Sequence, residues 1–415
     1  MASKARVLII GGGFGGLFTA LELAGHVDVT LLSEEDRFTF RPLLYEYLSG
    51  EVEEWHIAPP YHELIDERIN FVQARATDLD LSARKCIATD PESLESAIEY
   101  DVLVIAVGGQ TNYAGVPGAQ ENSLSFRGID DADRLRQRMV DALDRIPPDL
   151  PPQDVRSAVT FAVVGGGASG VELSTKMADL LTDAFARRAL KGEPRVLVIE
   201  MGDRVVPGMG ADIREHVERA LHLSRVEVHT LTRVVRVSEA SVTIEHEDTQ
   251  SEIAAAGIVW VGGVRVNPLI GNMQVEKTRN GLLKVTPTLQ IPAHDNVFAL
   301  GDIAHFEDAD APLAGTAQLA FQESALAARN VRALLAGEKL QTKHFEEIGE
   351  ALSLGTERGA VLTGGKVFGG AMARQARFAL YTSRLPTWQH RLRVGASWFF
   401  GGTTPRPLLP LGFQR

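Results

Sequence analysis

The sequence predicts an α/β protein with two Rossmann-like dinucleotide-binding domains, the second inserted in the first, followed by a C-terminal segment rich in basic and aromatic residues. A glycine-rich turn between a strand pattern and a helical pattern occurs twice, at residues 6–24 and 161–185. A later apolar run, 296–302, is typical of a strand that returns to the first domain. We assign residues 1–125 and 286–340 to the first domain, 126–285 to the second and 341–415 to the C-terminal segment.

Both glycine turns have the spacing Gly-x-Gly-x-x-Gly directly after an apolar run, RVLII (6–10) in one case and FAVV (161–164) in the other. Such glycines let the backbone turn sharply and approach a diphosphate, while the amides of the next helix face the phosphates. One copy alone is weak evidence, because ordinary glycine turns share it, but two copies indicate two nucleotide sites. The glycines are Gly11, Gly13, Gly16, Gly165, Gly167 and Gly170.

Acidic residues follow the second strand of each module. DVTLL (28–32) runs through Ser33 to Glu34 and Glu35, and RVLVI (195–199) ends at Glu200. An acid about 20 residues after the glycines binds the ribose hydroxyls of an adenosine. We expect Glu34 to bind the ribose, and Glu35 is the second candidate. The alternative is that both acids belong to a solvated turn without a ligand. Glu200 would repel a 2′-phosphate and therefore favours NADH over NADPH.

Three strand ends extend these sites. The runs 100–109 and 257–263 end in glycines, as strands beside a bound nucleotide do, although plain core strands would look the same. The run 296–302 ends in Gly-Asp, where the aspartate can bind a sugar or ribityl hydroxyl. The residues concerned are Gly108, Gly262, Gly263, Gly301 and Asp302.

The remaining segments predict ordinary helices, strands and connections. Residues 130–145 predict a polar helix. The proline-rich stretch 146–153 predicts a break between the modules, and residues 226–246 predict a β-meander. Gln318 and Gln322 are four residues apart on the helix after Gly-Asp, so they share one face. We expect a role in the site for both glutamines, with a solvated helix face as the alternative.

Length and composition narrow the class of protein. A chain of 415 residues, 45% of them apolar and 23% charged, is globular and large enough for two or three domains. We expect no membrane span, because no apolar run reaches 18 residues, and no secretory signal, because RVLII leads directly into a glycine turn. Cys86 is the only cysteine, which excludes an intrachain disulfide or a redox thiol pair and favours the reducing, cytoplasmic side. We expect neither a metal site nor a nucleic-acid partner.

The C-terminal segment differs from the rest in charge. Residues 358–415 contain nine Lys and Arg and no Asp or Glu, whereas residues 1–357 have a net charge of −21. Residues 371–385 predict a helix with Arg374, Arg377 and Arg384 on one arc. Basic residues followed by aromatic ones suit an anionic membrane surface. Docking on the protein's own acidic body, dimerisation and covering of a core are the alternatives. The neighbouring aromatic and apolar residues are Phe378, Tyr381, Leu385, Trp388, Trp398, Phe399 and Phe400.

Two nucleotide sites without redox cysteines or a metal cluster indicate one reaction type, in which a hydride passes from NADH in the second site to a flavin in the first. Glu172, just past the second glycine turn, could orient the nicotinamide or handle a proton near the flavin. The helix dipole alone also favours a carboxylate at that position.

These motifs resemble the type II NAD(P)H:quinone oxidoreductases, which are non-proton-pumping two-dinucleotide flavoproteins. The resemblance covers nearly the whole chain and rests on GGGFGG (11–16), RPLLYE (41–46), GGGASGVEL (165–173), ALGD (299–302) and AQLAFQ (317–322). It implies FAD in the first site, a membrane quinone near the two glutamines and a C-terminal segment resting on the membrane. The candidate FAD residues are Gly11, Gly13, Phe14, Gly15, Gly16, Glu34, Arg41, Gly108, Gly301, Asp302 and Gln318. The candidate NAD(P)H residues are Gly165, Gly167, Gly170, Glu172, Glu200, Gly262 and Gly263, and the candidate catalytic residues are Glu172, Gln318 and Gln322.

Two long stretches, YEYLSGEVEEWHIAP (45–59) and RLPTWQHRLRVGASWFF (384–400), resemble the cyanobacterial and plastid branch, which includes demethylphylloquinone reductases of phylloquinone biosynthesis. The resemblance implies a naphthoquinone acceptor such as demethylphylloquinone, or menaquinone or plastoquinone. Two features depart from the pattern. Ser33 stands where the wider family often has its acid, and Glu200 fits NADH although that branch is associated with NADPH.

Three other classes share parts of this pattern. A soluble flavoprotein reductase of a ferredoxin-like protein would share both glycine turns but would not need the tail. A non-catalytic NAD(H) sensor would lack an acceptor site, and a sulfide:quinone reductase would need more cysteines than Cys86. We expect a peripheral protein on the cytoplasmic side of a plasma or thylakoid membrane, and a homodimer is possible.

Overall fold

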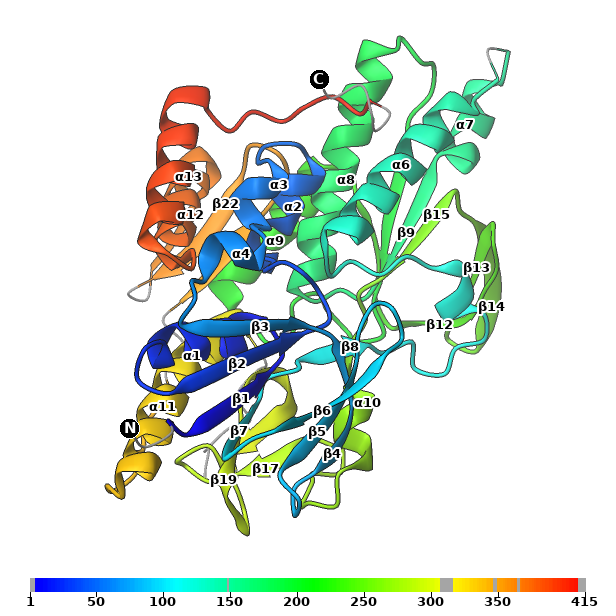
Figure 1. The fold of residues 1–415 in the computed structure, drawn as a ribbon. Coiled ribbons are helices and arrows are strands. Elements are labelled where there is room, and N and C mark those ends of the chain that lie inside the picture. The colour runs from blue at the N-terminus through cyan, green and yellow to red at the C-terminus, as the bar shows by residue number, and fades with distance from the viewer. Residues whose placement is uncertain (1–3, 148, 307–315, 346–348, 364–365, 410–415) are drawn as a thin grey trace.

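The computed structural model describes residues 4–147, 149–306, 316–345, 349–363 and 366–409. The protein has three parts: the N-terminal sheet at the bottom of Figure 1, a second sheet at the upper right and a C-terminal part at the upper left. The first two parts each contain a mainly parallel sheet with helices packed on it. The predicted α/β class is therefore confirmed.

A six-stranded sheet forms the centre of the first part, in the order β18-β19-β7-β1-β2-β3. Its neighbours are parallel except β18 and β19, and the expected return strand is β19, which pairs with β7. Successive side chains of β1 point to opposite faces, so Ile9 packs in the core that contains Leu17 of α1, and Leu8 in the core that contains Cys86 of β5. The strands are β1 (Arg6–Ile10), β2 (Asp28–Ser33), β3 (Ile69–Gln73), β7 (Val102–Ile105), β18 (Gln290–Ile291) and β19 (His294–Ala299).

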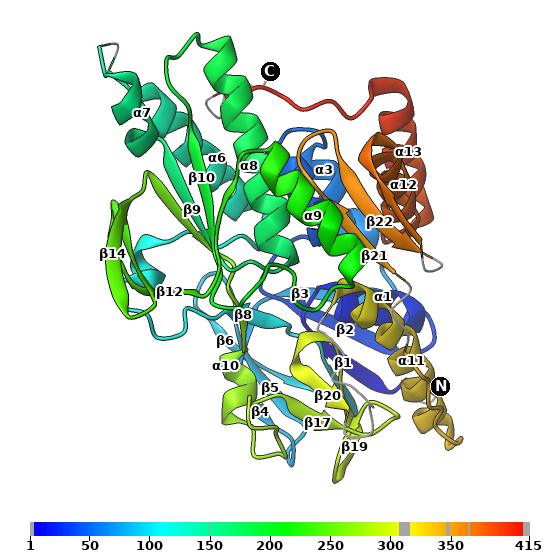
Figure 2. The same cartoon turned by 180° about the vertical axis from the view of Figure 1, so that it is seen from behind.

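Helices cover one face of this sheet, and a small antiparallel sheet packs on the other. Helices α1 (Phe14–Leu23) and α11 (Ala317–Ala336) lie side by side in both views (Figures 1 and 2). The small sheet consists of β4 (Arg75–Asp80), β5 (Lys85–Thr89) and β6 (Glu95–Glu99). The lone Cys86 lies buried on β5, and burial raises the pKa of its thiol to about 12. The thiol therefore stays protonated near neutral pH and is no redox nucleophile.

The second part repeats this plan with a parallel sheet in the order β11-β10-β9-β15. Its strands are β9 (Thr160–Val164), β10 (Arg195–Ile199), β11 (Glu227–His229) and β15 (Gly257–Trp260). Its longer helices are α6 (Ile129–Asp144), α8 (Ala168–Arg187) and α9 (Ala211–Leu223).

Two local expectations in this part are wrong. The meander expected at 226–246 begins later and ends at Ala254, because β11 joins the parallel sheet; it consists of β12 (Thr232–Val237), β13 (Ser241–His246) and β14 (Thr249–Ala254). The proline-rich stretch 146–153 is not wholly a break. Pro152 begins helix α7 (Pro152–Ala158), as the first helical position tolerates proline.

Short elements connect the parts. Between β2 and β3 lie η1 (Arg41–Leu43), α2 (Leu44–Leu48), α3 (Glu54–Ile57) and α4 (Tyr61–Leu64). The pairs β8 (Gly109–Thr111) with β16 (Val264–Val266) and β17 (Leu283–Val285) with β20 (Ala304–Phe306) flank the sheets. The remaining short helices are α5 (Ala119–Asn122), α10 (Pro268–Asn272) and η2 (Gly301–Ile303).

The C-terminal part is a three-stranded antiparallel sheet with two helices. The sheet consists of β21 (Glu350–Ser353), β22 (Gly359–Thr363) and β23 (Lys366–Gly369), and the helices are α12 (Gly370–Arg384) and α13 (Trp388–Gly401). From α13 the chain runs in an extended form across to the second part (Figure 1). On the way, the backbone N–H of Arg406 donates to the carbonyl of Ser49, and in the second part Arg136 of α6 donates to the carbonyl of Pro407.

The basic arc of α12 faces inward, against the expectation that it meets a membrane. Arg377 is 1% exposed and donates to Glu46 at 2.6 Å, and Arg374 donates to Glu51 at 2.7 Å. Burial alone would raise the pKa of Glu46, but the charges of Arg377 and of Lys176 on α8 outweigh it and lower the pKa to about 2. For these two arginines, docking on the protein's own acidic body is the correct interpretation.

These side chains form one buried ion network, with three carboxylates and three cations. Lys176 pairs with Glu51 and lies 3.5 Å from Glu46, and Arg377 lies 3.4 Å from Glu172. The network joins the segment before α3, helix α8 of the second part and α12 of the C-terminal part. Its members are Glu46, Glu51, Glu172, Lys176, Arg374 and Arg377.

Several apolar side chains of α12 and α13 are exposed on the outside of the protein. Met372 and Phe400 are 81% and 86% exposed. We call this surface the outer apolar face; its members are Met372, Leu380, Trp388, Leu392, Phe399 and Phe400. Within the described ranges, no helix has the length and apolar character that crossing a membrane requires.

The buried ion network leads to a prediction about the free energy of unfolding. Arg377→Met removes the cation between Glu46 and Glu172 and leaves buried negative charge uncompensated, so we expect a loss of about 3–5 kcal/mol. Urea unfolding of the purified protein measures it.

The matched control is Arg393→Met, which breaks the surface pair of Arg393 with Glu63, both at least 40% exposed. Such pairs contribute less than about 1 kcal/mol. Equal losses in the two variants would show that the network does not hold the parts together.

Candidate functional site

A cavity of about 1,920 Å³ lies where the three parts meet. Both glycine turns line it, through Gly11–Gly15 and Gly167–Ser169. The ends of β2 and η2 and the inner side of α12 complete its wall. One space therefore connects the two predicted nucleotide sites with the C-terminal part.

The first glycine turn has the geometry that a diphosphate site needs. Gly11 has φ +102°, and a Cβ there would lie 2.3 Å from the carbonyl oxygen of Ala106. A Cβ at Gly16 would lie 1.7 Å from the carbonyl oxygen of Gly11, so α1 packs directly on the turn. A Cβ at Gly13 would meet no atom within 4 Å. The first and third glycines thus shape the turn, and the second leaves its backbone open to the cavity.

The second turn repeats this arrangement. A Cβ at Gly170 would lie 1.8 Å from the carbonyl oxygen of Gly165, and Gly167 is open to the cavity. A Cβ at Gly165 would lie 2.5 Å from the Cα of Gly262, so Gly262 allows β15 to approach the turn. Neither Gly262 nor Gly263 is among the cavity-lining residues. Gly262 supports the turn itself, whereas a Cβ at Gly263 would lie 3.7 Å from the Cβ of Asn112.

Glu200 lies at the end of β10 beside this turn. Its two carboxylate oxygens each accept a backbone N–H at 2.6 Å, one from Gly166 and one from Gly202. The carboxylate is therefore fixed next to the second glycine turn, where an adenosine ribose would lie.

At the end of β2, Glu34 and Glu35 both line the cavity. Glu34 is exposed and forms an ion pair with Arg75, which also lines the cavity. The structure thus brings both predicted acids to the first site, and Glu34 shares its carboxylate with a neighbouring arginine.

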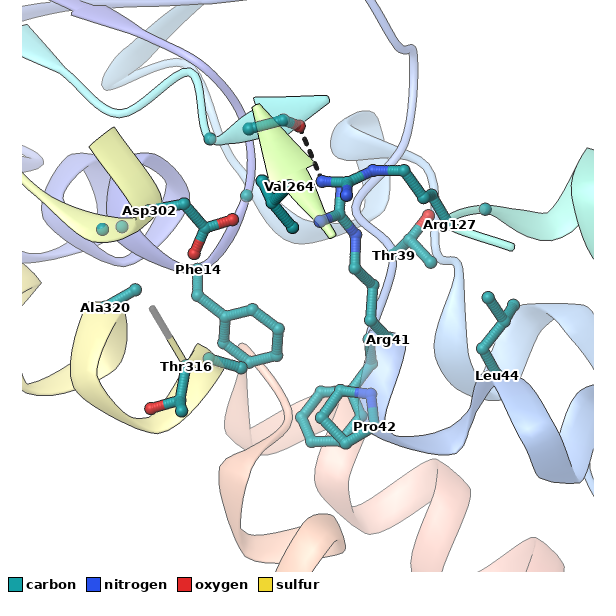
Figure 3. Close-up of a pocket in the computed structure, with 18 of the residues that line it drawn as sticks. Phe14, Thr39, Arg41, Pro42, Leu44, Arg127, Val264, Asp302, Thr316 and Ala320 are labelled. Carbon is teal, nitrogen blue, oxygen red and sulfur yellow. Dashed lines mark hydrogen bonds between the residues drawn. The ribbon is translucent and has the colours of Figure 1, made fainter. Parts of the chain in front are cut away.

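The Gly-Asp turn brings a carboxylate to the first site from the return strand. Gly301 has φ +76°, and the carboxylate of Asp302 points into the cavity beside Phe14 (Figure 3). The Cβ position of Gly108 lies 3.7 Å from the Oδ2 of Asp302, so the ends of β7 and β19 meet here.

Two arginines face this carboxylate, and the sequence predicted only Arg41. Figure 3 shows Arg41 and Arg127 side by side in the cavity wall, with Arg127 donating to the carbonyl of Gly109 at 2.6 Å. Burial and the charge of Arg41 lower the pKa of Arg127 to about 10. Neither forms an ion pair with a described residue. Two like charges held together in a cavity indicate an anion site.

No local pattern marks Arg127 in the sequence, because it lies alone between helix α5 and the start of α6. Its orientation comes from Asp131 in the first turn of that helix, which accepts the backbone N–H of Arg127 at 2.8 Å. The sequence predicts a helix that begins with acidic residues, but it does not indicate that Asp131 orients Arg127.

Glu172, the fifth residue of α8, lines the cavity and belongs to the buried ion network. It accepts the backbone N–H of Ser353 at 2.8 Å. Burial raises the pKa of Glu172 to about 7, against the lowering effects of Arg377 and the Ser353 N–H. A carboxyl with this pKa can both give and take a proton near neutral pH.

Of the two predicted glutamines, Gln318 lines the cavity and Gln322, one turn further along α11, does not. Near Gln318 the wall becomes aromatic and apolar, and Arg384 stacks over the ring of Phe321 at 5.1 Å. We call this region the acceptor end; its members are Gln318, Phe321, Leu380, Tyr381 and Arg384.

This chain belongs to the pyridine nucleotide-disulphide oxidoreductase family, whose profile matches residues 5–324. Among its relatives, demethylphylloquinone reductase NdbB of Synechocystis sp. is 36% identical over 95% of this chain and 96% of that protein. The chloroplastic and mitochondrial alternative NAD(P)H-ubiquinone oxidoreductase C1 of Arabidopsis thaliana is 32% identical over 95% of this chain and 80% of that protein. The resemblance read from the motifs is confirmed.

A solved structure of similar shape is that of NDH2 from Plasmodium falciparum in complex with NADH. It matches with a TM-score of 0.87 and 19% identity over 98% of this chain and all of that one. At this identity the match shows the fold alone.

FAD and NAD(P)H are the cofactors of this family, and the residues present fit them. The open backbone at Gly13 and Gly167 suits two diphosphates, and Arg41 and Arg127 add positive charge to the first site. Asp302 supplies a hydrogen-bond acceptor for a hydroxyl. The cavity has the polar groups and the room that two dinucleotides require.

The arginine pair makes a prediction about flavin binding. Arg41→Met or Arg127→Met removes a charge-assisted hydrogen-bond donor from the anion site, so we expect FAD to bind about tenfold to a hundredfold more weakly. Titration of the apoprotein with FAD measures this.

The control is Arg187→Met, which loses only a helix-surface pair with Asp183. Unchanged FAD affinity together with weaker NAD(P)H binding would assign the arginines to the second nucleotide.

Proposed function

We propose that this protein is a membrane-associated, non-proton-pumping NAD(P)H:quinone oxidoreductase whose acceptor is a naphthoquinone such as demethylphylloquinone. The observation that carries the proposal is the 36% identity over almost the full length of both chains to a relative named demethylphylloquinone reductase. The acceptor end gives this proposal a physical basis. Menaquinone and plastoquinone are the alternative acceptors of the same chemistry.

FAD held at the first glycine turn would supply the two-electron redox chemistry between NAD(P)H and the quinone. The second glycine turn and Glu200 hold the NAD(P)H adenosine, and the fixed carboxylate of Glu200 disfavours a 2′-phosphate. Glu172 holds or moves a proton at its carboxyl oxygens where the two sites meet. These roles follow from position and charge.

At the acceptor end, Gln318 can hydrogen-bond a quinone oxygen, and Phe321, Leu380 and Tyr381 can pack against its rings. Tyr381 donates to the carbonyl of Ala351 at 3.3 Å, which holds the phenol ring in place. Gln322 does not line the cavity, so we assign the acceptor contact to Gln318 alone.

The outer apolar face supports a peripheral position on a membrane. Leu380 belongs both to this face and to the cavity wall, so the same helix separates the acceptor end from the lipid side. An apolar quinone could therefore reach Gln318 without crossing water. We assign the protein to the cytoplasmic side of a plasma or thylakoid membrane, in keeping with its single buried thiol. A homodimer stays a prediction.

Anaerobic stopped-flow spectroscopy tests the reaction. The yellow protein is mixed with NADH or NADPH and then with menadione, a soluble naphthoquinone. We expect fast bleaching of the flavin and fast return of its absorbance, with NADH about tenfold faster than NADPH because of Glu200.

Two outcomes would contradict these expectations. Bleached flavin that is reoxidised by a small ferredoxin but not by menadione would favour the ferredoxin-type reductase. Equal rates with NADH and NADPH would show that Glu200 does not discriminate between them.

Membrane docking is tested on the outer apolar face. Removing residues 358–415, the obvious truncation, would uncover the buried ion network, so point substitutions are preferable. The triple variant Leu392→Ser, Phe399→Ser, Phe400→Ser should lose at least about tenfold in binding to anionic vesicles, since each apolar side chain contributes about 1.5–3 kcal/mol when it leaves water.

Cosedimentation with phosphatidylglycerol-containing vesicles measures this loss, and reduction of ferricyanide by NADH should be spared. The control is Leu223→Ser, an equally exposed leucine on α9. Full vesicle binding by the triple variant would place the docking surface elsewhere.

A further inference from the structure

A second buried carboxyl, Glu323, lies behind the wall of the flavin site. Its side chain is 0% exposed, and its Oε2 accepts the backbone N–H of Gly301 at 2.6 Å. Ala320, one turn earlier on α11, lines the cavity, whereas Glu323 does not. Glu323 therefore touches the Gly301–Asp302 turn from its protein side and can act on a ligand only through that turn.

The other carboxyl oxygen of Glu323, Oε1, has no hydrogen-bond partner among the described residues. A buried carboxylate with one unsatisfied oxygen is costly, whereas the neutral acid loses less on burial. Burial raises the pKa of Glu323 to about 7; the Gly301 N–H opposes this rise and the charge of Asp302 adds to it. The group therefore changes charge near neutral pH.

The charged groups around Glu323 are few. Asp302 in η2 is the neighbour whose charge acts on its pKa. Helix α1 carries only Glu22, which is exposed, and β19 carries His294 and Asp295 at the end away from Gly301. Arg384 of α12 reaches α11 at Phe321. No described cation pairs with Glu323.

We propose that Glu323 is a positioning residue that holds the Gly301–Asp302 turn in place for FAD and, through its own charge, makes FAD retention depend on pH. The neutral acid offers its carbonyl oxygen to Gly301 and leaves Asp302 as the single negative charge at the turn. The ionised form adds a second negative charge behind Asp302. The proposal rests on the flavin site alone, so failure of quinone reduction would leave it intact.

The direction follows from linkage. Filling the cavity removes water from the cavity side of the Gly301–Asp302 turn and places the diphosphate anion there, and both effects favour the neutral acid behind the turn. FAD binding therefore takes up a proton, and affinity falls as pH rises through the titration of Glu323. A rise of one unit in its pKa on binding corresponds to about tenfold weaker binding at high pH.

Release of FAD from the holoenzyme, followed by flavin fluorescence after dilution between about pH 6 and 8.5, tests this. Free oxidised FAD does not titrate in this range. We expect wild-type release to become about threefold to tenfold faster at the high end. Glu323→Gln should match the wild type at pH 6 and keep slow release at pH 8.5, because the amide oxygen can accept from Gly301 and carries no charge. Glu323→Ala, which leaves the Gly301 N–H unpaired, should release FAD faster at every pH.

Glu172 titrates in the same range, so Glu172→Gln measures its share of the profile separately. The proposal is overturned by a Glu323→Gln profile identical to wild type, by a wild-type profile without pH dependence, or by unchanged retention in Glu323→Ala. Fast release from Glu323→Gln already at pH 6 would also overturn it, since the wild-type side chain is neutral there.

Discussion

The pairing of Arg377 with Glu46 and Glu172 is the interaction on which the arrangement of the three parts depends. These side chains come from helices α12, α2 and α8, and all three are buried where the parts of the protein meet. A buried ion network contributes little net stability compared with apolar packing of the same volume. Each of its charges nevertheless requires its partners, so the three segments can come together in few ways. That selectivity fixes Glu172 at the edge of the cavity.

The same pairing explains why α12 is apolar on its outside. A helix whose basic residues are used inside the protein has only its other residues left for the surface, and on α12 these include Met372 and Leu380. Leu380 also lines the cavity. The helix thus lies between the cavity and the protein surface, and Leu380 takes part in both. Helix α12 therefore contributes to the buried ion network with one face and to the exposed apolar surface with the other.

The sequence predicts those features that local stereochemistry decides. The two glycine turns, strand β1 at 6–10 and strand β10 at 195–199 follow from a few neighbouring residues, since steric contacts at Gly11 and Gly165 leave little choice. Contacts between distant residues decide the rest. Arg374 meets Glu51 across 323 positions, and a helical wheel cannot tell whether an arginine on an arc meets lipid or a buried glutamate. The sequence did not predict roles for Arg127 and Glu323 for the same reason. Arg127 lies beside Arg41 and Glu323 binds Gly301, and both neighbours are distant in the sequence.

Glu172 and Glu323 show how burial can serve two different purposes. In both, removal from water raises the pKa to about 7. Glu172 lines the cavity and has Arg377 and the Ser353 N–H beside it, so either charge state is supported and a proton can be exchanged with a bound molecule. Glu323 is sealed behind the Gly301–Asp302 turn with one oxygen unsatisfied, so its proton has no direct path to a ligand and its charge acts on the turn instead. Exposure to the cavity, and not the pKa, separates a carboxyl suited to proton transfer from one suited to positioning.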